Sequence, residues 1–315
     1  MAQTAKAVKP KPGRVKSFGI AMWRTRWLHV LALPGLIYLA IFQYGPMYGV
    51  LMAFQNFRVR DGIWGSEWVG LDQFRRFFDH PFFWQLIRNT LTINVYQLLF
   101  FFPLPIIFAL LLNEVRPMFF KRTVQTISYL PNFISTVAIV GMLIMFLSPT
   151  DGFINRIIVF FGGNTIHFMA QPGWFRTLFI SVDIWSGLGW GAIIYIAALA
   201  GVNPELYESA VLDGASRIKM MRHISIPGIA PTIIILLLLR LGQMMSLGHE
   251  QVLLMQNPLN MQTSEVISTF IFRRGLEFND FSFAQAVSVF NSLINIVILV
   301  AANQVSRKVS ETSLW

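Results

Sequence analysis

The sequence predicts an all-α membrane protein that crosses the bilayer about six times, with both termini on the cytoplasmic side. Of its 315 residues, 55% are hydrophobic and 13% are charged, whereas about a quarter of the residues of an ordinary soluble domain are charged. The sequence contains several predominantly apolar runs, and each is long enough to cross a bilayer as a helix of about 20 residues. The six runs lie near residues 28–54, 89–113, 125–148, 178–202, 231–253 and 283–303.

Other membrane and secretory architectures fit less well. The run Thr232–Gly242 is continuously apolar, whereas transmembrane β-strands alternate apolar and polar residues. The first run is longer than a signal-peptide core and lacks a small-residue cleavage site, so we expect a retained helix. The sequence contains no cysteine, which excludes disulfides, thiolate metal sites and cysteine nucleophiles.

The net charge of +10 is concentrated on one side of the predicted membrane. If the N-terminus is cytoplasmic, the inner segments are 1–27, 114–124, 203–230 and 304–315. These segments carry 15 basic residues (Lys and Arg) and five acidic residues (Asp and Glu). The outer loops carry nine basic and eight acidic residues. The asymmetry follows the positive-inside rule and predicts this orientation. It also accounts for the basic charge without a nucleic-acid partner.

The predicted domains are a basic cytoplasmic tail at 1–27, a transmembrane domain at 28–303 and a cytoplasmic tail at 304–315. The outer loop near 55–88 is rich in aromatic residues, which predicts an amphipathic segment at the membrane interface; a sugar-stacking surface is the alternative. In the last outer loop, Ser264–Phe272 is expected to form a helix followed by a turn at Arg274-Gly275.

The inner loop at 203–227, between the fourth and fifth runs, carries helix start and stop signals. Asn203 can cap a helix that has Pro204 at its first position, and Asp213-Gly214 provides a break. A second helix is expected to begin near Ser216 and to end at Pro227. Two short helices on one face of a membrane protein suggest a docking element for a soluble partner. An ordinary amphipathic loop on the inner membrane surface fits these residues equally well.

The sequence of this loop resembles the EAA loop of permease subunits in binding-protein-dependent ABC importers. The family pattern is Glu-Ala-Ala, two residues, Asp-Gly-Ala, and an Ile-x-x-Pro about nine residues further on. Residues that occupy the motif positions are Glu208, Ser209, Ala210, Asp213, Gly214, Ala215, Ile224 and Pro227. Ser209 departs from the pattern by replacing one small residue with another. The resemblance implies that the loop inserts a short helix into a cleft of an ATPase subunit.

The resemblance extends over nearly the whole chain and points to the sugar-uptake branch of type I ABC importer permeases. The segments that carry it are Pro34–Phe54, Trp68–Phe78, Leu130–Ser135 and Asp183–Leu199. It implies a multi-pass subunit of the bacterial cytoplasmic membrane that pairs with a second, related permease. It further implies two ATPase subunits that bind ATP and Mg, an external binding protein and an oligosaccharide cargo. This chain itself would bind no cofactor and catalyse no reaction.

Polar and aromatic residues within the spans are candidates for the substrate pathway, because a charge at the bilayer centre costs about 2.5–3.5 kcal/mol and therefore faces a cavity or a partner. Sugars also need hydroxyl partners and aromatic faces. The candidates are Asn94, Tyr96, Gln97, Asp183, Trp185, Trp190, Tyr195, Arg240, Gln243, Asn291 and Asn295. Hydrogen bonding between helices is the alternative for the amides, and interfacial anchoring is the alternative for the tryptophans.

An ion-coupled secondary carrier of a small polar solute is the alternative function. Such a carrier would need ion-coordinating groups near the midplane, and acidic residues are missing from the centres of the predicted spans. The structured inner loop would also be unexplained. The sequence contains no Walker A pattern, which fits a permease whose ATPase is a separate chain.

Overall fold

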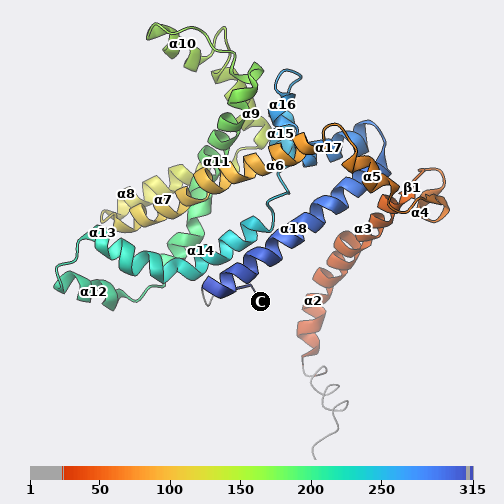
Figure 1. Ribbon diagram of the computed structural model, residues 1–315. Helices are drawn as coiled ribbons and strands as arrows, with labels where there is room; N and C mark the ends of the chain where they lie inside the picture. Colours follow the sequence, from red (N-terminus) through yellow and green to blue (C-terminus); the bar gives the residue numbers. More distant parts are fainter. Residues whose placement is uncertain (1–22, 24, 310–312, 315) are drawn as a thin grey trace, which may run out of the picture. The chain divides into compact units, whose positions relative to one another are not determined.

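The computed structural model describes residues 23, 25–309, 313 and 314, and almost all of its regular elements are helices (Figure 1). Most of the predicted basic tail at 1–27, including its lysines and Arg14 and Arg24, lies outside the described residues. The chain divides into two compact units, Met1–Leu51 and Met52–Trp315.

The described part of the first unit, from Arg26 onwards, is one long apolar helix. Helix α2 (Arg26–Leu39) continues through the π-helical turn η1 (Ala40–Tyr44) and α3 (Gly45–Met47) into the 3-10 helix η2 (Tyr48–Phe54). Together they form a candidate membrane span over Arg26–Phe54, as the first apolar run predicts. No side chain of α2 is buried, which is expected of an apolar helix that faces lipid or another subunit.

Four further helices in the described part of the chain are long and apolar enough to cross a membrane. Two of them are built from shorter elements joined by π-helical turns. The elements are α6 (Phe83–Tyr96), η3 (Gln97–Phe101) and α7 (Pro103–Glu114); α11 (Pro172–Ala200); α13 (Arg217–Met220), η6 (Met221–Ser225) and α14 (Ile226–Leu241); and α18 (Phe281–Val309).

The third apolar run forms two helices rather than one straight span. Helix α8 (Met118–Tyr129) and the 3-10 turn η4 (Leu130–Phe133) meet α9 (Thr136–Phe146) at an angle of 98°. Pro131 lacks the backbone N–H that would continue the helix. Ser135 then starts a new helix by accepting a hydrogen bond from the Ala138 backbone N–H at 3.3 Å.

The connecting segments contain short elements. These are β1 (Gln55–Asn56), α4 (Gly62–Gly65), β2 (Glu67–Trp68), α5 (Asp72–Phe78), α10 (Phe153–Phe160), η5 (Phe168–Ala170), α12 (Pro204–Leu212), α15 (His249–Met255), α16 (Met261–Ser264), α17 (Ile267–Phe272) and η7 (Arg273–Glu277). Strands β1 and β2 pair antiparallel, with Gln55 opposite Trp68. The aromatic loop at 55–88 only partly matches the predicted interfacial segment, because Phe77 is fully buried and packs edge-on against Phe83 and Phe290.

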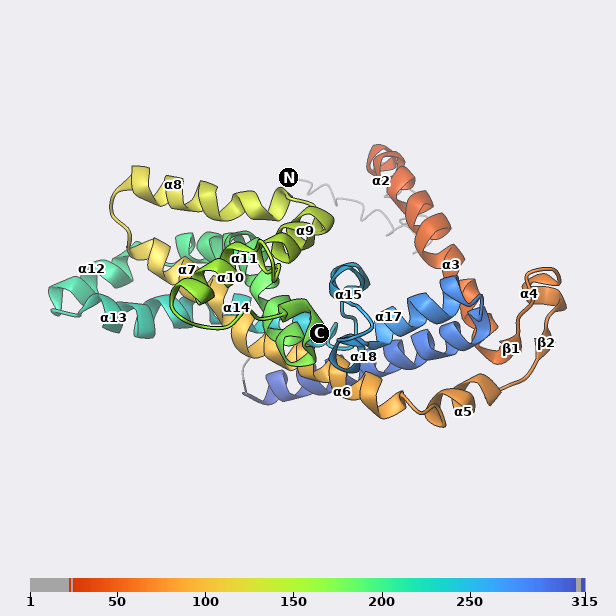
Figure 2. The ribbon, with the colours of Figure 1, turned by 90° about the horizontal axis from the view of Figure 1, so that it is seen from above.

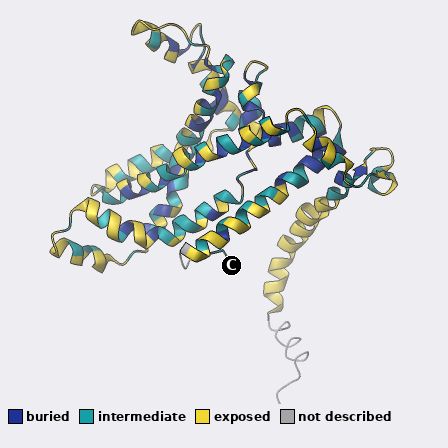
Figure 3. Ribbon diagram, in the orientation of Figure 1, coloured by how far each residue is buried: buried dark blue, intermediate teal, exposed yellow. Residues whose placement is uncertain are grey.

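Three apolar clusters hold the second unit together, and the buried residues in Figure 3 follow them. The first joins α6, α9, α11 and α15, for example through Ile93, Val140 and Phe179. The second joins α5, α6, α17 and α18 around Phe77 and Phe283. The third joins α7, α11 and α14. The long helices of this unit are therefore packed against one another along their apolar faces.

Several predicted boundaries were wrong. The fifth run was expected to span 231–253, but the helix covers Arg217–Leu241 and is followed by a non-helical stretch before α15. No turn forms at Arg274-Gly275, because the helix continues as η7. A side chain at Gly275 would place its Cβ 3.2 Å from that of Ala284, so this glycine permits close packing against α18. Helix α18 also extends into the predicted C-terminal tail.

Helices α12 and α13 lie at the end of the second unit where α7 leads into α8, as both Figure 1 and Figure 2 show. Two segments predicted to share one side of the membrane, 114–124 and 203–230, are therefore at the same end of this unit.

Candidate functional site

The loop at 203–227 folds as its start and break signals predict. The Asn203 side chain accepts a hydrogen bond from the Glu205 backbone N–H at 3.0 Å, and Pro204 occupies the first position of α12. This helix ends at Leu212, Asp213 follows as its C-cap, and Gly214 has φ +71°. Glycine tolerates this left-handed conformation, which terminates the helix and reverses the chain.

The second half of the loop differs from the prediction at Pro227. Ser216 caps α13 by accepting a hydrogen bond from the Lys219 backbone N–H at 3.4 Å. The helix does not stop at Pro227, which is the second residue of α14. The π-helical turn Met221–Ser225 precedes this proline and widens the helix where the proline ring removes a hydrogen bond. One continuous helix therefore connects the loop to the interior of the unit.

The loop presents apolar side chains to its surroundings. Leu212 is 88% exposed and Ile218 is 74% exposed. A hydrogen bond of 3.0 Å between the Tyr207 and Ser225 hydroxyls ties α12 to the long helix. Of the motif residues, the exposed ones are Glu208, Ser209, Asp213, Gly214 and Pro227, and the half-buried ones are Ala210, Ala215 and Ile224. A loop that is fixed to the long helix and exposes apolar side chains has the properties of a docking surface.

Three of the predicted pathway residues meet inside the helix bundle. The Arg240 guanidinium on α14 donates a hydrogen bond to the side-chain oxygen of Gln97. The Gln97 amide, at the start of η3, donates in turn to the Asp183 carboxylate on α11 at 2.5 Å. A neutral amide thus connects a cation and an anion that belong to two other helices.

The remaining amide candidates occupy different environments. Asn94 is buried and donates to the Thr90 backbone carbonyl of its own helix at 2.9 Å. Asn295 accepts from the Met245 backbone N–H and donates to the Ser246 hydroxyl, so it fixes the irregular stretch after α14. Gln243, in that stretch, is exposed, and the buried Asn291 has a side-chain oxygen without a hydrogen-bond partner.

The aromatic candidates for the substrate pathway also lie in different environments. Tyr195 is 3% exposed and packs in the apolar cluster of α7, α11 and α14, which is a core position. Trp190 contacts Phe133 edge-on, and Tyr96 contacts Phe100 in the same way. Trp185 lines two cavities, of about 340 and 470 Å³, between α11 and the bent pair α8–α9.

Comparison with known proteins identifies the family. Residues 101–311 match the family described as binding-protein-dependent transport system inner membrane component. The chain belongs to this family. It is a permease subunit of an ABC importer, and the predicted resemblance is confirmed.

Relatives of this permease match along nearly their whole length. Protein LplB of Bacillus subtilis (strain 168) is 42% identical over 303 residues, covering 96% of this chain and 95% of its own. The polygalacturonan/rhamnogalacturonan transport system permease protein YteP of the same organism is 42% identical over 309 residues, covering 98% and 96%. A crystal structure of a bacterial alginate ABC transporter, in complex with alginate pentasaccharide-bound periplasmic protein, contains a similar chain. That chain matches with a TM-score of 0.86 and 40% identity, covering 93% of the permease and 98% of itself.

The permease also contains a polar cluster that the sequence did not predict. Glu265 is 6% exposed and accepts two hydrogen bonds of 2.8 Å from Arg273, and Gln256 contacts both side chains. Asn89 of α6 donates to the backbone carbonyls of Gln262 and Glu265. These bonds fasten the segment between α15 and η7 to α6. Charges in a loop usually indicate exposure to solvent, so the sequence carried no signal for this cluster.

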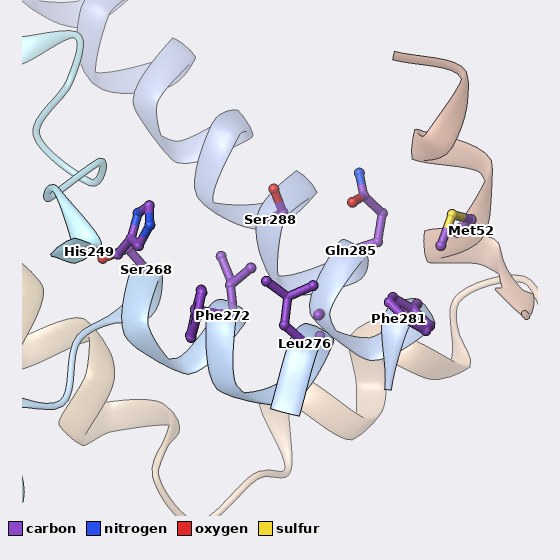
Figure 4. A pocket seen from close by; sticks show the side chains of 11 residues that line it. Met52, His249, Ser268, Phe272, Leu276, Phe281, Gln285 and Ser288 are labelled. Carbon is purple, nitrogen blue, oxygen red and sulfur yellow. The ribbon is translucent and has the colours of Figure 1, made fainter. Parts of the chain in front are cut away.

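A cavity of about 480 Å³ in the second unit of the permease lies beside this segment (Figure 4). It is lined by Met52 and by α15, α17, η7 and α18, with His249 stacked on Phe272 at a ring distance of 5.7 Å. Ser268, Gln285 and Ser288 supply its polar groups. The side-chain oxygen of Ser268 is buried without a hydrogen-bond partner.

Among the described residues outside the spans, His80, between α5 and α6, has an environment that opposes protonation of its ring. Burial lowers its pKa below the usual 6.5, and the nearby Arg274 and Arg76 lower it further. Its ring nitrogens face the Arg274 guanidinium at 3.1 Å and the Phe82 backbone N–H at 3.2 Å. Both neighbours are donors, so a doubly protonated ring would have no acceptor on either side. Arg76 is itself paired with Asp280 at 2.8 Å.

Acidification is therefore expected to destabilise the permease through His80. Because the folded-state pKa is depressed, this contribution to stability is complete above about pH 6.5 and is lost as the pH falls towards the folded-state pKa. The midpoint of thermal unfolding should fall more between about pH 8 and about pH 5 in the wild type than in His80→Asn, which does not titrate there. Equal falls in the two proteins would contradict the assignment.

Proposed function

We propose that this permease forms half of the translocation pathway of an ATP-driven importer that takes up oligosaccharides delivered by an extracytoplasmic binding protein. It pairs with a second, related permease and with two ATPase subunits, which bind ATP and Mg. The subunit itself catalyses no reaction and binds no cofactor. It resides in the bacterial cytoplasmic membrane, with its termini and the EAA loop at 203–227 in the cytoplasm.

The observation that carries this proposal is the local structure of the EAA loop. Its two short helices are separated at Gly214, are held by the Tyr207–Ser225 hydrogen bond and expose Leu212 and Ile218. A docked ATPase subunit would cover these apolar groups and meet the exposed Glu208. The continuous helix Arg217–Leu241 gives the loop a rigid connection to the interior.

The cargo class is supported by the relatives, two of which are named for acidic polysaccharides or their transport. We propose oligosaccharide fragments of such polysaccharides as cargo. Trp185, which lines two cavities, supplies an aromatic face of the kind that sugar rings stack on. The pathway further includes Gln243, Asn291 and Asn295, while the core positions of Asn94 and Tyr195 fit helix packing better.

ATP hydrolysis by the assembled complex tests the cargo class. The permease should be purified with its partner permease, the ATPase and the binding protein, and reconstituted in vesicles. Oligogalacturonides or alginate fragments are expected to stimulate ATP hydrolysis through the binding protein, and neutral arabino-oligosaccharides should stimulate it less. Stimulation only by neutral sugars would contradict the acidic cargo, and equal uptake without ATP would contradict the importer and favour the secondary carrier.

Charge reversal at Glu208 tests the role of the loop. Glu208→Lys places a cation on the exposed face of α12 and is expected to abolish uptake, while the affinity of the binding protein for sugar stays unchanged. Reversal of the exposed Glu205 near the cap is the matched control and should have the smaller effect. Normal uptake by a folded, inserted Glu208→Lys complex would contradict the proposal.

A further inference from the structure

The hydrogen-bonded chain Arg240–Gln97–Asp183, hereafter the polar bridge, joins three different spans. Its members belong to α14, to the π-helical turn between α6 and α7, and to α11. At a helical rise of about 1.5 Å per residue, Gln97 and Asp183 lie roughly 15 to 25 Å from the ends of their helices. They therefore lie at the depth of the hydrocarbon core, where each unpaired charge costs about 2.5–3.5 kcal/mol.

The position of Arg240 relates the polar bridge to the EAA loop. Arg240 lies in the last turn of the helix Arg217–Leu241, and the loop leads into the first turn of the same helix. This helix is roughly 37 Å long at the standard rise. The chain after it is not helical until His249. The far end of the helix that carries the loop is thus attached, through Arg240, to the two helices beside it.

Gln97 is placed where its helix is least regular. It begins the π-helical turn Gln97–Phe101, and Pro103, the first residue of α7, lies two residues after this turn. Such turns interrupt the regular hydrogen-bond ladder and are common at functional positions in helices. Gln97 itself is 7% exposed, and both polar atoms of its amide are used by Arg240 and Asp183. A shift of Arg240 would consequently act on the bend between α6 and α7 and on α11 together.

We propose that the polar bridge transmits movement of the EAA loop to α6–α7 and α11. In this role Arg240, Gln97 and Asp183 position the spans and do not contact cargo. The proposal rests on the proposed ATPase coupling. A helix that is not attached at its far end would slide or bend when the loop moves, whereas the bridge makes the three spans move together. Hydrogen-bond networks between rigid elements are one way in which coupling between distant sites is carried.

Removal of either charge is expected to uncouple transport from ATP hydrolysis. In the reconstituted complex, Arg240→Gln and Asp183→Asn should each lower cargo transported per ATP by about tenfold, while ATP hydrolysis stays within about twofold of the wild type. The double variant should recover to within about threefold, because it removes both charges and keeps a chain of amide hydrogen bonds. Arg240→Lys retains a cation and should fall between these values.

Leu239→Ala, next to Arg240 on an exposed face of the same helix, is the matched control and should leave cargo per ATP unchanged. A raised KM for the loaded binding protein with unchanged cargo per ATP would overturn the proposal in favour of cargo contact. If cargo transport and ATP hydrolysis fall in parallel in an intact complex, and the double variant does not recover, the bridge has only a structural role. If Glu208→Lys abolishes uptake while the Arg240 variants remain coupled, only the bridge fails; normal uptake by Glu208→Lys contradicts the proposed function itself.

Discussion

Gly214→Val is expected to abolish uptake without preventing membrane insertion. Gly214 has φ +71°, a left-handed conformation that costs an ordinary residue about 1–2 kcal/mol and is especially unfavourable for a β-branched side chain. Valine would instead favour an extended or right-handed conformation, which changes the direction between α12 and α13. A misdirected α12 would no longer present Glu208 to an ATPase subunit. Uptake of labelled oligosaccharide in vesicles, with co-purification of the ATPase, measures the effect.

Two variants separate backbone conformation from side-chain volume. Asparagine tolerates the left-handed conformation better than most residues, so Gly214→Asn should retain a substantial part of the uptake. A Cβ at Gly173 would meet nothing within 4 Å, and Gly173→Val should therefore transport normally. Wild-type uptake by a folded Gly214→Val complex would contradict the requirement for this turn.

The local structure of the EAA loop was predictable because its signals are short-range. The cap at Asn203, the break at Gly214 and the cap at Ser216 each depend on neighbouring residues. The stop predicted at Pro227 was wrong for a related reason. A proline interrupts one hydrogen bond, but the π-helical turn Met221–Ser225 accommodates that loss and the packed helix continues.

The tertiary arrangement of the polar residues was not predictable from one sequence. Arg240, Gln97 and Asp183 could be identified as polar groups in spans, but their mutual contact depends on how three helices pack. The Glu265–Arg273 pair was missed entirely, because nothing local distinguishes a buried loop charge from a solvated one. Hydropathy gave the number of apolar runs but not their ends, since packing and breaks such as Pro131 set those ends.

Close packing around α11 also depends on positions that hydropathy does not report. Gly187 and Gly191 are four residues apart and share a face, which lies against Phe101 and Pro105 near the start of α7. Gly189 faces the backbone of Ser128 on α8. Small residues of this kind let helices approach closely in membranes, where packing contributes much of the association energy.

Gly189→Ala is accordingly expected to destabilise the helix bundle severely. A Cβ at Gly189 would lie 2.2 Å from the Ser128 carbonyl oxygen and 2.5 Å from its carbonyl carbon. These are backbone atoms, so relief requires α8 to move away from α11. Overpacking a core costs about 1–3 kcal/mol, and a backbone clash should lie at or above the upper end. We expect a lower yield of folded protein and a lower midpoint of thermal unfolding in detergent.

Gly141→Ala on α9 is the matched control, because it makes the same chemical change where a Cβ would meet nothing within 4 Å. Alanine is favoured over glycine within helices by about 0.5–1 kcal/mol, so this variant should be as stable as the wild type or slightly more stable. If Gly189→Ala unfolds at the same thermal midpoint as Gly141→Ala, α8 and α11 are not held in contact at this point. The bend between α8 and α9, and with it the two cavities beside Trp185, would then be free to change without affecting the stability of the bundle.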